Sequence, residues 1–419
     1  MILSKEIQNF LLDNAVERFL RYVKNWTTSD ENTENIPSTQ GQIEFGKLLV
    51  EELKSLNYEN IIQDEFGYIY ANLPPSQGFE NVKKVGFIAH LDTSPAVSGK
   101  DVKPVIHKNY NGTAIKFSQD NDLELNINDS LQLEKYIGLD IITSQGDTLL
   151  GADDKAGIAE IMTACAAWKK FPELKHGPIV VCFFPDEEIG RGTKKVNIEK
   201  LPKICYTLDG SEMGELESEC FDAWKALIKF KGLSVHPGYA KNLMFNAIHI
   251  ACRFLSEIPE SESPEHTEER EGFYHLSNLQ GREEEATANL IIRDFELKNN
   301  KRRMDYITSL KNAYQIRYPS LKIGLDFQHQ YENMYDYLKK EHKIIDLAEK
   351  AIELAGIEVN IHLIRGGTDG SHLSAMGIPT PNIFTGGLLF HSKKEYIPTL
   401  SLQKAAEVVI HLAELFTKE

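Results

Sequence analysis

Two adjacent glutamates, Glu187 and Glu188, follow an apolar run over 179–184. With Asp186 they place three carboxylates directly after an expected buried strand, where their mutual repulsion is costly unless cations or solvent offset it. Neighbouring residues of an extended chain point to opposite sides. We therefore expect the two glutamates to take different roles, one bound to a metal ion and one facing the reacting water. A solvated acidic loop is the alternative for this segment taken alone.

A second apolar run, over 85–89, ends in His90-Leu-Asp92. Alternate side chains of a strand share one face, so the imidazole and the carboxylate are expected side by side. A metal-bound histidine usually has its second ring nitrogen held by a carboxylate, and Asp92 stands where that partner would be. A capped strand end with a surface histidine is the alternative.

Three further segments carry residues of the same kind. Asp153 and Asp154 precede an expected helix, where an aspartate commonly caps; Asp209 ends the apolar run 204–208; His391 follows a pair of glycines at 386–387. Imidazole nitrogens and carboxylate oxygens are ligands that zinc accepts. One shared carboxylate would allow two such ions about 3.5–4 Å apart. The signatures H-E-x-x-H and G-x-S-x-G are absent from the sequence.

The elements that must position these residues follow from the hydrophobic pattern. Strands and helices alternate up to about residue 220, which predicts an α/β fold with a central mixed sheet flanked by helices. Between 221 and 332 the order becomes strand, helix, strand, strand, helix, strand, the ferredoxin-like split motif. The expected strands cover 85–89, 179–184, 204–208, 223–230, 273–280, 286–295 and 321–329, and the expected helices 5–25, 38–56, 156–169, 242–258, 301–317 and 402–416. We predict a catalytic domain in two parts, 1–220 and 333–419, with an α+β lid domain, 221–332, inserted between them.

Composition narrows the class of protein. The 419 residues carry a formal net charge of −16, which argues against a nucleic-acid partner because phosphate contacts need clustered lysine and arginine. No apolar run approaches the ~20 residues of a membrane span, and we expect no signal peptide. The five cysteines stand singly, mostly in apolar stretches, as in reduced cytosolic proteins. We expect a soluble cytoplasmic protein without membrane partners.

Seven segments together resemble the co-catalytic dizinc metallopeptidases, and among them the peptidase T branch of tripeptide aminopeptidases; the family also includes carboxypeptidase G and succinyl-diaminopimelate desuccinylase. The resemblance covers nearly the whole chain. The segments are His90-Leu-Asp-Thr-Ser-Pro, Leu150-Gly-Ala-Asp-Asp-Lys-Ala-Gly, Pro185-Asp-Glu-Glu, His236-Pro-Gly, Glu271-Gly-Phe-Tyr-His, Ile291-Ile-Arg-Asp-Phe and Ile364-Arg-Gly-Gly-Thr-Asp-Gly.

The resemblance implies a role for each of these residues. His90, Asp153 and Asp209 would hold one zinc ion, and Asp153, Glu188 and His391 the other. Asp92 would orient His90, and the Asp153–Asp154 peptide would be cis. Glu187 would act as general base and then acid while water activated by two zinc ions attacks a small peptide.

The inserted domain would supply the remaining contacts. His236 would donate to the developing oxyanion, with a surface turn before Pro237 as the alternative. Arg293 and Arg365 are candidate clamps for a substrate carboxylate, or else structural residues, and Asn246 is a weaker substrate-binding candidate. A homodimer through this domain is possible.

One segment departs from the family pattern. The usual aromatic residue and asparagine before the metal-binding histidine are replaced in Leu388-Leu389-Phe390-His391, and Ser392 follows in place of glycine. Substrate preference is therefore the open question. A dipeptidase or an N-acyl amino-acid deacylase is the main alternative activity. A catalytically silent binding protein is disfavoured, because every expected ligand and the expected base are present.

Overall fold

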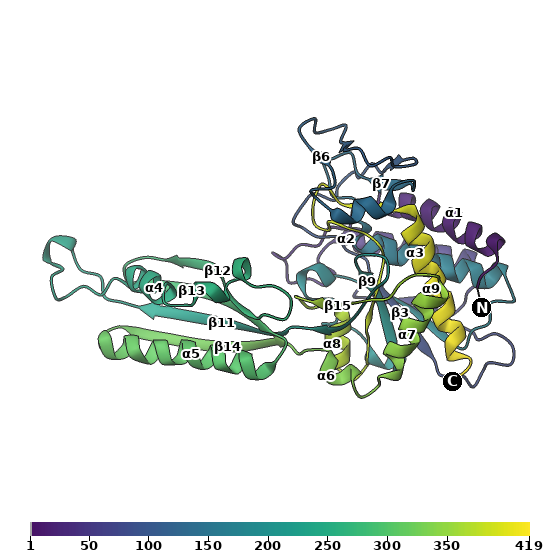
Figure 1. The fold of residues 1–419 in the computed structure, drawn as a ribbon. Helices are drawn as coiled ribbons and strands as arrows, with labels where there is room; N and C mark the ends of the chain where they lie inside the picture. The colour runs from purple at the N-terminus through teal and green to yellow at the C-terminus, as the bar shows by residue number, and fades with distance from the viewer. Residues whose placement is uncertain (1) are drawn as a thin grey trace. The chain divides into compact units, whose positions relative to one another are not determined.

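The buried strands predicted from the apolar runs form the middle of a mixed sheet. The computed structural model describes residues 2–419, which divide into two units (Figure 1). Unit 1 runs as far as residue 218 and adds Tyr337–His362 and Thr368–Glu419. Unit 2 comprises Glu219–Asp336 and Leu363–Gly367.

The main sheet has eight strands in the order β1-β2-β8-β3-β9-β16-β10-β15. β3 pairs in parallel with both β8 and β9, and β9 pairs in parallel with β16. The carboxyl ends of these strands therefore meet at one edge of the sheet, where α/β proteins commonly build their sites. The strands are β1 (Ile61–Gln63), β2 (Ile69–Leu73), β3 (Val85–His90), β8 (Ile179–Phe184), β9 (Cys205–Gly210), β10 (Glu215–Cys220), β15 (Asn360–Ile364) and β16 (Asn382–Phe384).

Helices cover both faces of the central strands, which is why those strands read as continuous apolar runs. On one face Phe87 of β3 stacks on Tyr206 of β9, and Tyr206 meets Phe416 of α9 edge-on. On the other face Ile88 lies in one core cluster with Leu373 of α8. α1, α3 and α9 pack together, and α7 lies against α9 (Figure 1). The helices are α1 (Lys5–Tyr22), α2 (Gln40–Ser55), α3 (Ala152–Lys170), α6 (Tyr335–Leu338), α7 (Lys343–Leu354), α8 (Asp369–Ala375) and α9 (Thr399–Phe416).

Unit 1 also contains two small sheets that the hydrophobic pattern did not predict. A three-stranded sheet has the order β17-β7-β4, and a two-stranded sheet pairs β5 with β6. Their strands are too short for a period to show, and they are held by a shared core that includes Phe117, Tyr136 and Tyr396. The strands are β4 (Val105–His107), β5 (Ile115–Lys116), β6 (Glu124–Leu125), β7 (Ile141–Thr143) and β17 (Tyr396–Pro398).

Unit 2 is a four-stranded antiparallel sheet in the order β12-β13-β11-β14, with α4 and α5 packed on it (Figure 1). Every second residue of β13 is buried from Ala286 onward, because one face of the sheet meets the helices. Its elements are β11 (Asp222–Lys231), α4 (Ala247–Leu255), β12 (Phe273–Gly281), β13 (Glu285–Asp294), α5 (Leu297–Arg317) and β14 (Lys322–Tyr331). The predicted fold class, a mixed α/β sheet with an inserted ferredoxin-like α+β part, is confirmed.

One predicted helix is wrong at its start. The pattern indicated a helix over 242–258, whereas α4 begins at Ala247. Residues 241–243 form a turn instead, and the backbone of Phe245 exchanges hydrogen bonds with that of Leu233 at 2.9 and 3.0 Å in an isolated bridge. Asn246 then caps the helix through its side chain. Within residues 2–419, no helix combines the length and the hydropathy needed to cross a membrane.

Candidate metal centre and active site

The shared edge of β3 and β9 brings a histidine and two aspartates together. His90 is the last residue of β3, and Asp209 lies one residue before the end of β9. Asp153 lies in the non-helical first turn of α3 and contacts His90. The Nε2 atom of His90 is 2.8 Å from Asp153 Oδ1 and 3.5 Å from Asp209 Oδ1. These three residues form one group of ligand-type donors.

A second group shares Asp153 with the first. The Nε2 atom of His391 is 3.0 Å from Asp153 Oδ2 and 2.9 Å from Glu188 Oε2. One oxygen of Asp153 thus faces each histidine. The side chain of His391 is 46% exposed whereas that of His90 is 2% exposed, so solvent approaches this group from the side of His391.

Asp154 also lies within ligand distance of His90 and Asp209. Its Oδ2 accepts the backbone N–H of His90 at 2.9 Å, and its Oδ1 accepts that of Gly157 at 3.2 Å. Asp154 is therefore engaged in fixing the end of β3, which leaves Asp153 to face the two histidines. The Asp153–Asp154 peptide is cis.

Asp92 supports two parts of the cluster at once. Its Oδ1 lies 3.3 Å from His90 Nδ1, and its two oxygens accept the backbone N–H groups of Glu187 at 3.0 Å and Glu188 at 3.2 Å. The residue is fully buried. It connects the orientation of the His90 ring to the turn that carries both glutamates.

The chain at Glu187 and Glu188 is not extended, so the reason given for their different roles was wrong. Both residues lie in a single 3-10 turn, Glu187–Ile189, entered through Asp186 at a φ of 57°. The two N–H bonds to Asp92 fix this turn, and the Asp186 carboxylate accepts from Ser38 N and Gln42 Nε2, both at 2.7 Å. The side chains still meet different surroundings: Glu188 contacts His391, whereas the charges of Asp209 and Asp369 act on Glu187.

The electrostatics of the cluster show an excess of negative charge. Burial raises the pKa of Glu188 to about 8 and that of Glu187 well above its ordinary value. Burial alone would raise the pKa of Asp153 as well, but hydrogen bonds from His391 and His90 outweigh it and hold that pKa below its ordinary value. Hydrogen bonds to Asp153 and Glu188 raise the pKa of His391 to about 10. The raised pKa values of both glutamates and of His391 show that the cluster favours added positive charge, as protons or as cations.

The donor set fits divalent cations. Glu188 Oε1 and Asp369 Oδ2 are buried without a hydrogen-bond partner among residues 2–419. Unpartnered buried carboxylate oxygens are costly unless a proton or a cation occupies the site. Two histidines and three carboxylates, one of them placed between the others, match the nitrogen and oxygen ligands of a two-metal centre.

Three supporting residues were given no role in the sequence analysis. Glu395 accepts four backbone N–H groups of the segment 150–153. Asp369, next to Thr368 in a motif already noted, is buried close enough to His90 and Asp209 for their charges to act on it. Lys155 is 1% exposed and donates to Thr27 Oγ1 at 2.8 Å; burial lowers its pKa to about 8. Only the local motif around Asp153 pointed to Lys155.

Four predicted residues belong to unit 2. His236 begins a 3-10 turn, Pro237–Tyr239, and its Nδ1 accepts the N–H of Gly238 at 3.1 Å. Asn246 caps α4 by accepting the N–H of His249 at 3.0 Å, so its side-chain oxygen already has a structural partner.

The two arginines predicted to bind substrate, Arg293 and Arg365, donate to backbone carbonyls. Arg293 donates to the carbonyls of Trp224 and Ile292, each at 3.0 Å, and lies over the ring of Tyr331. Arg365 donates to the carbonyls of Glu269 and Glu271 at 2.8 and 2.9 Å. Both guanidinium groups therefore hold their own unit together, whatever else they bind.

The segment that departs from the family pattern has an unusual backbone. Leu389 and His391 both adopt a positive φ, 55° and 58°, which is uncommon for residues other than glycine. A bridge between Leu388 and Tyr396 closes the loop that contains them. His391 is therefore presented from a tight, closed loop.

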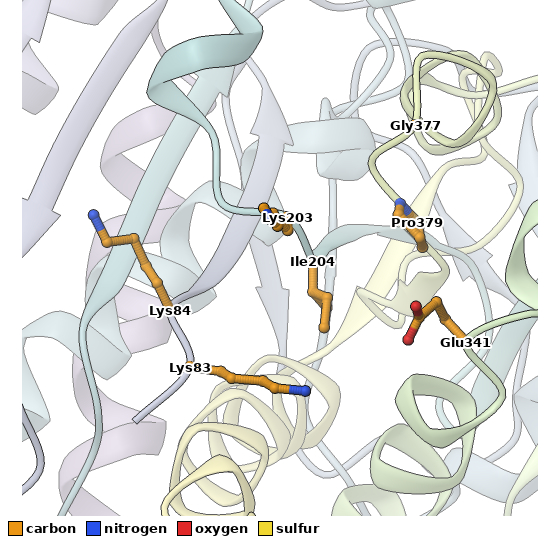
Figure 2. A pocket seen from close by; sticks show the side chains of 7 residues that line it. All are labelled: Lys83, Lys84, Lys203, Ile204, Glu341, Gly377 and Pro379. Atoms are coloured by element: carbon orange, nitrogen blue, oxygen red, sulfur yellow. The ribbon is translucent and has the colours of Figure 1, made fainter. Parts of the chain in front are cut away.

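A cavity of about 680 Å³ in unit 1 lies at the opposite strand ends (Figure 2). Lys83 and Lys84 precede β3, Lys203 precedes β9, and Glu341 faces them across the cavity. This lining has one carboxylate and no histidine, so it lacks the ligand set found at the carboxyl ends. The chemistry belongs to the cluster around Asp153.

Comparison with known proteins decides the family. A profile described as peptidase family M20/M25/M40 matches residues 149–415. The chain belongs to this family. Peptidase T of Caldanaerobacter subterraneus subsp. tengcongensis is 46% identical over 409 residues, covering 97% of this chain and 100% of the relative. M20 peptidases are metal-dependent enzymes, and the predictions of enzyme class and family are confirmed.

Solved structures agree on the fold. An aminopeptidase from Bacillus cereus superposes with a TM-score of 0.75 at 21% identity, covering 97% of this chain and 99% of that one. A tripeptidase from Staphylococcus aureus gives 0.76 at 20% identity with the same coverage. The M20/M25/M40 chain therefore has the architecture of these enzymes over nearly its whole length.

Proposed function

We propose that the chain is a dizinc aminopeptidase that releases the N-terminal residue from small peptides, with tripeptides as the preferred class. The observation that carries the proposal is the position of Asp153, whose two oxygens face His90 and His391 at 2.8 and 3.0 Å. The 46% identity to a Peptidase T over the full length of that relative supports the choice of substrate class.

Two zinc ions would be held by groups that share Asp153. His90, Asp153 and Asp209 are assigned to one ion, and Asp153, Glu188 and His391 to the other. When bound by these residues, zinc would lower the pKa of a coordinated water toward neutral and polarise the scissile carbonyl. Asp92 would keep His90 in the orientation that offers Nε2 to the metal.

Glu187 is assigned the proton transfers. Burial and the neighbouring charge of Asp209 raise the pKa of Glu187. A raised pKa makes the carboxylate a stronger base, so it can accept a proton from the attacking water and return it later. In the proposed reaction Glu187 takes that proton as the C–O bond forms. It then passes the proton to the amine nitrogen as the C–N bond breaks.

The substrate contacts are assigned to unit 2. His236 would donate a hydrogen bond to the developing oxyanion. Arg293 and Arg365 would bind the carboxylate of the peptide through spare guanidinium donors. Asn246 is the weakest of these assignments, because its side-chain oxygen already caps α4.

The compartment and the assembly are also part of the proposal. Of the five free cysteines four are buried, which suits the reducing conditions of the cytoplasm. We propose a cytoplasmic enzyme that forms a homodimer through unit 2.

The test of the mechanism is Glu187→Ala. Loss of the general base should lower kcat by about 10²–10⁴-fold or more, with the zinc content nearly unchanged. Glu199→Ala, an exposed carboxylate of the same unit, is the matched control and should keep normal turnover. Near-normal turnover in Glu187→Ala would overturn the assignment.

A peptide panel tests the substrate class. Di-, tri- and tetrapeptides, free and N-acetylated, are offered to the zinc-loaded enzyme. We expect cleavage of free tripeptides. Cleavage restricted to acetylated substrates would identify a deacylase instead, and cleavage restricted to dipeptides would identify a dipeptidase.

A further inference from the structure

Glu395 is a buried carboxylate whose side chain accepts backbone N–H groups of one distant segment. It is 1% exposed. Its Oε2 accepts the N–H groups of Leu150 at 2.7 Å and Gly151 at 2.8 Å. Its Oε1 accepts those of Ala152 at 2.6 Å and Asp153 at 3.2 Å. All four bonds link regions more than 240 residues apart in the sequence.

The segment that Glu395 holds is the one that carries Asp153. The first N–H groups of a helix have no partner within the helix, and a negative charge is favourable at that end. α3 begins at Ala152, yet Asp153 and Asp154 depart from helical φ and ψ. The helix therefore does not fix the backbone at Asp153 by itself, and the bonds to Glu395 do so from outside.

The other end of this connection is the loop that carries His391. The backbones of Leu388 and Tyr396 exchange hydrogen bonds at 2.9 and 3.0 Å, which closes the loop over residues 388–396. Within it, the N–H of Glu395 donates to the carbonyl of Ser392 at 3.3 Å. His391 and Glu395 thus sit on one closed loop, four residues apart.

Two connections consequently join the same two segments. At the side chains, His391 Nε2 is 3.0 Å from Asp153 Oδ2. At the backbone, Glu395 accepts from the N–H of Asp153 and its three predecessors. We propose that Glu395 is a positioning residue that sets the separation of Asp153 and His391, and with it the affinity of the metal site that these two residues share. The inference rests on the proposed two-metal function.

The alternative is that Glu395 only caps α3. A cap stabilises the fold and leaves metal affinity unchanged. A positioning residue changes the affinity of one ion, because supporting residues of metal ligands typically affect affinity by about 10–100-fold. Metal binding therefore separates the two roles, and stability alone does not.

The experiment measures zinc binding to Glu395→Gln by titration against a competing chelator. The glutamine has nearly the same size, but its amide nitrogen cannot accept an N–H, so two of the four bonds are lost. We expect one of the two zinc ions to bind about 10–100-fold more weakly and peptide cleavage to return at excess zinc. Glu395→Asp, which keeps the charge but shortens the side chain, should show a smaller loss.

Two further variants keep the result interpretable. Glu407→Gln, another carboxylate that is 1% exposed, should bind both ions as the unmodified protein does. In a His391→Ala background the substitution at Glu395 should cause little additional loss of metal affinity, because both changes act on the same ion.

One outcome would overturn the inference. If Glu395→Gln binds both ions with unchanged affinity and only its unfolding temperature falls, Glu395 is a helix cap. If Glu395→Gln does not fold, the aspartate variant decides between the two roles by the same measurement. Failure of the unmodified protein to bind two zinc ions would instead refute the proposed function, on which this inference depends.

Discussion

Buried acids stand at strand ends in both units, and their partners differ. In unit 2, Asp294 accepts a hydrogen bond from Arg303 Nη1 at 2.5 Å. Asp222 contacts Trp224 Nε1 at 2.7 Å and His329 Nε2 at 2.8 Å. In unit 1, Glu188 and Asp369 each leave one buried oxygen without a hydrogen-bond partner among residues 2–419. The chain supplies donors to these two acids of unit 2, whereas Glu188 and Asp369 each keep one oxygen unmatched within residues 2–419.

This difference separates structural acids from functional ones. A buried carboxylate matched by an arginine or by several hydrogen bonds is part of the scaffold, and removing it leaves a buried partner uncompensated. A set of buried carboxylates with raised pKa values and too few donors stores unfavourable energy, and such sets are typical of sites that bind cations. Burial and charge together, rather than the acid count, distinguish the two.

The largest effect that would test this comparison is expected at Asp294. Asp294→Ala removes one of the two carboxylates that pair with the buried Arg303 and should destabilise unit 2 by about 3–5 kcal/mol. Hydrogen exchange of unit 2 amides in the full chain would report it. Asp326→Ala, an exposed acid on β14, is the control and should change stability by less than about 0.5 kcal/mol. Equal effects of the two substitutions would contradict the scaffold role of Asp294.

The pH dependence of zinc-free protein should expose the unmatched acids of unit 1. The pKa values of Glu188, about 8, and His391, about 10, are both raised, so the native state holds more protons than the unfolded chain between about pH 6.5 and 8. Stability must then fall as pH rises, by about 1.4 kcal/mol per pH unit for each extra proton.

Zinc should reverse that trend, because metal binding displaces the protons and strengthens with pH. Unfolding temperatures at pH 6.5 and pH 8, with a chelator and with zinc, measure both slopes. The same slope in both conditions would show that the cluster does not take up the metal.

The smallest effect is expected at Asp369 and has the opposite sign to that at Asp294. Burial raises the pKa of Asp369 well above its ordinary value, so its ionised form is unfavourable in the fold at neutral pH. Asp369→Asn should stabilise the zinc-free protein by about 0.5–2 kcal/mol at pH 7.5. Urea unfolding measures the change. A loss of stability as large as that of Asp294→Ala would place Asp369 with the scaffold acids.

The long apolar runs predicted the central strands and the order of elements in unit 2, because hydrophobic periodicity is a local property of the sequence. Other strands of unit 1 were missed, most of them because two or three residues show no period; they are β1, β2, β4 to β7, β10 and β15 to β17. The turn at Glu187 was also missed. It depends on N–H bonds to Asp92, 95 residues earlier, and no local pattern encodes such a bond.

The site was predictable only in part for the same reason. His90, Asp153 and Asp209 could be predicted because they are polar residues at the ends of apolar runs or before a helix. Glu395 did not, because its role is defined by four N–H groups about 240 residues away. Roles that depend on such distant contacts become visible once the strands have been placed side by side.

Asp153 and His391 lie 238 residues apart in the sequence, and this separation has a consequence for synthesis of the protein. A ribosome completes β3, α3 and the turn at Glu187 long before it reaches the loop over 388–396. Until that loop emerges, the four N–H groups at 150–153 lack the carboxylate that accepts them, and Asp153 lacks one of its two histidines. The cluster around Asp153 is therefore complete only after the loop over 388–396 has been synthesised.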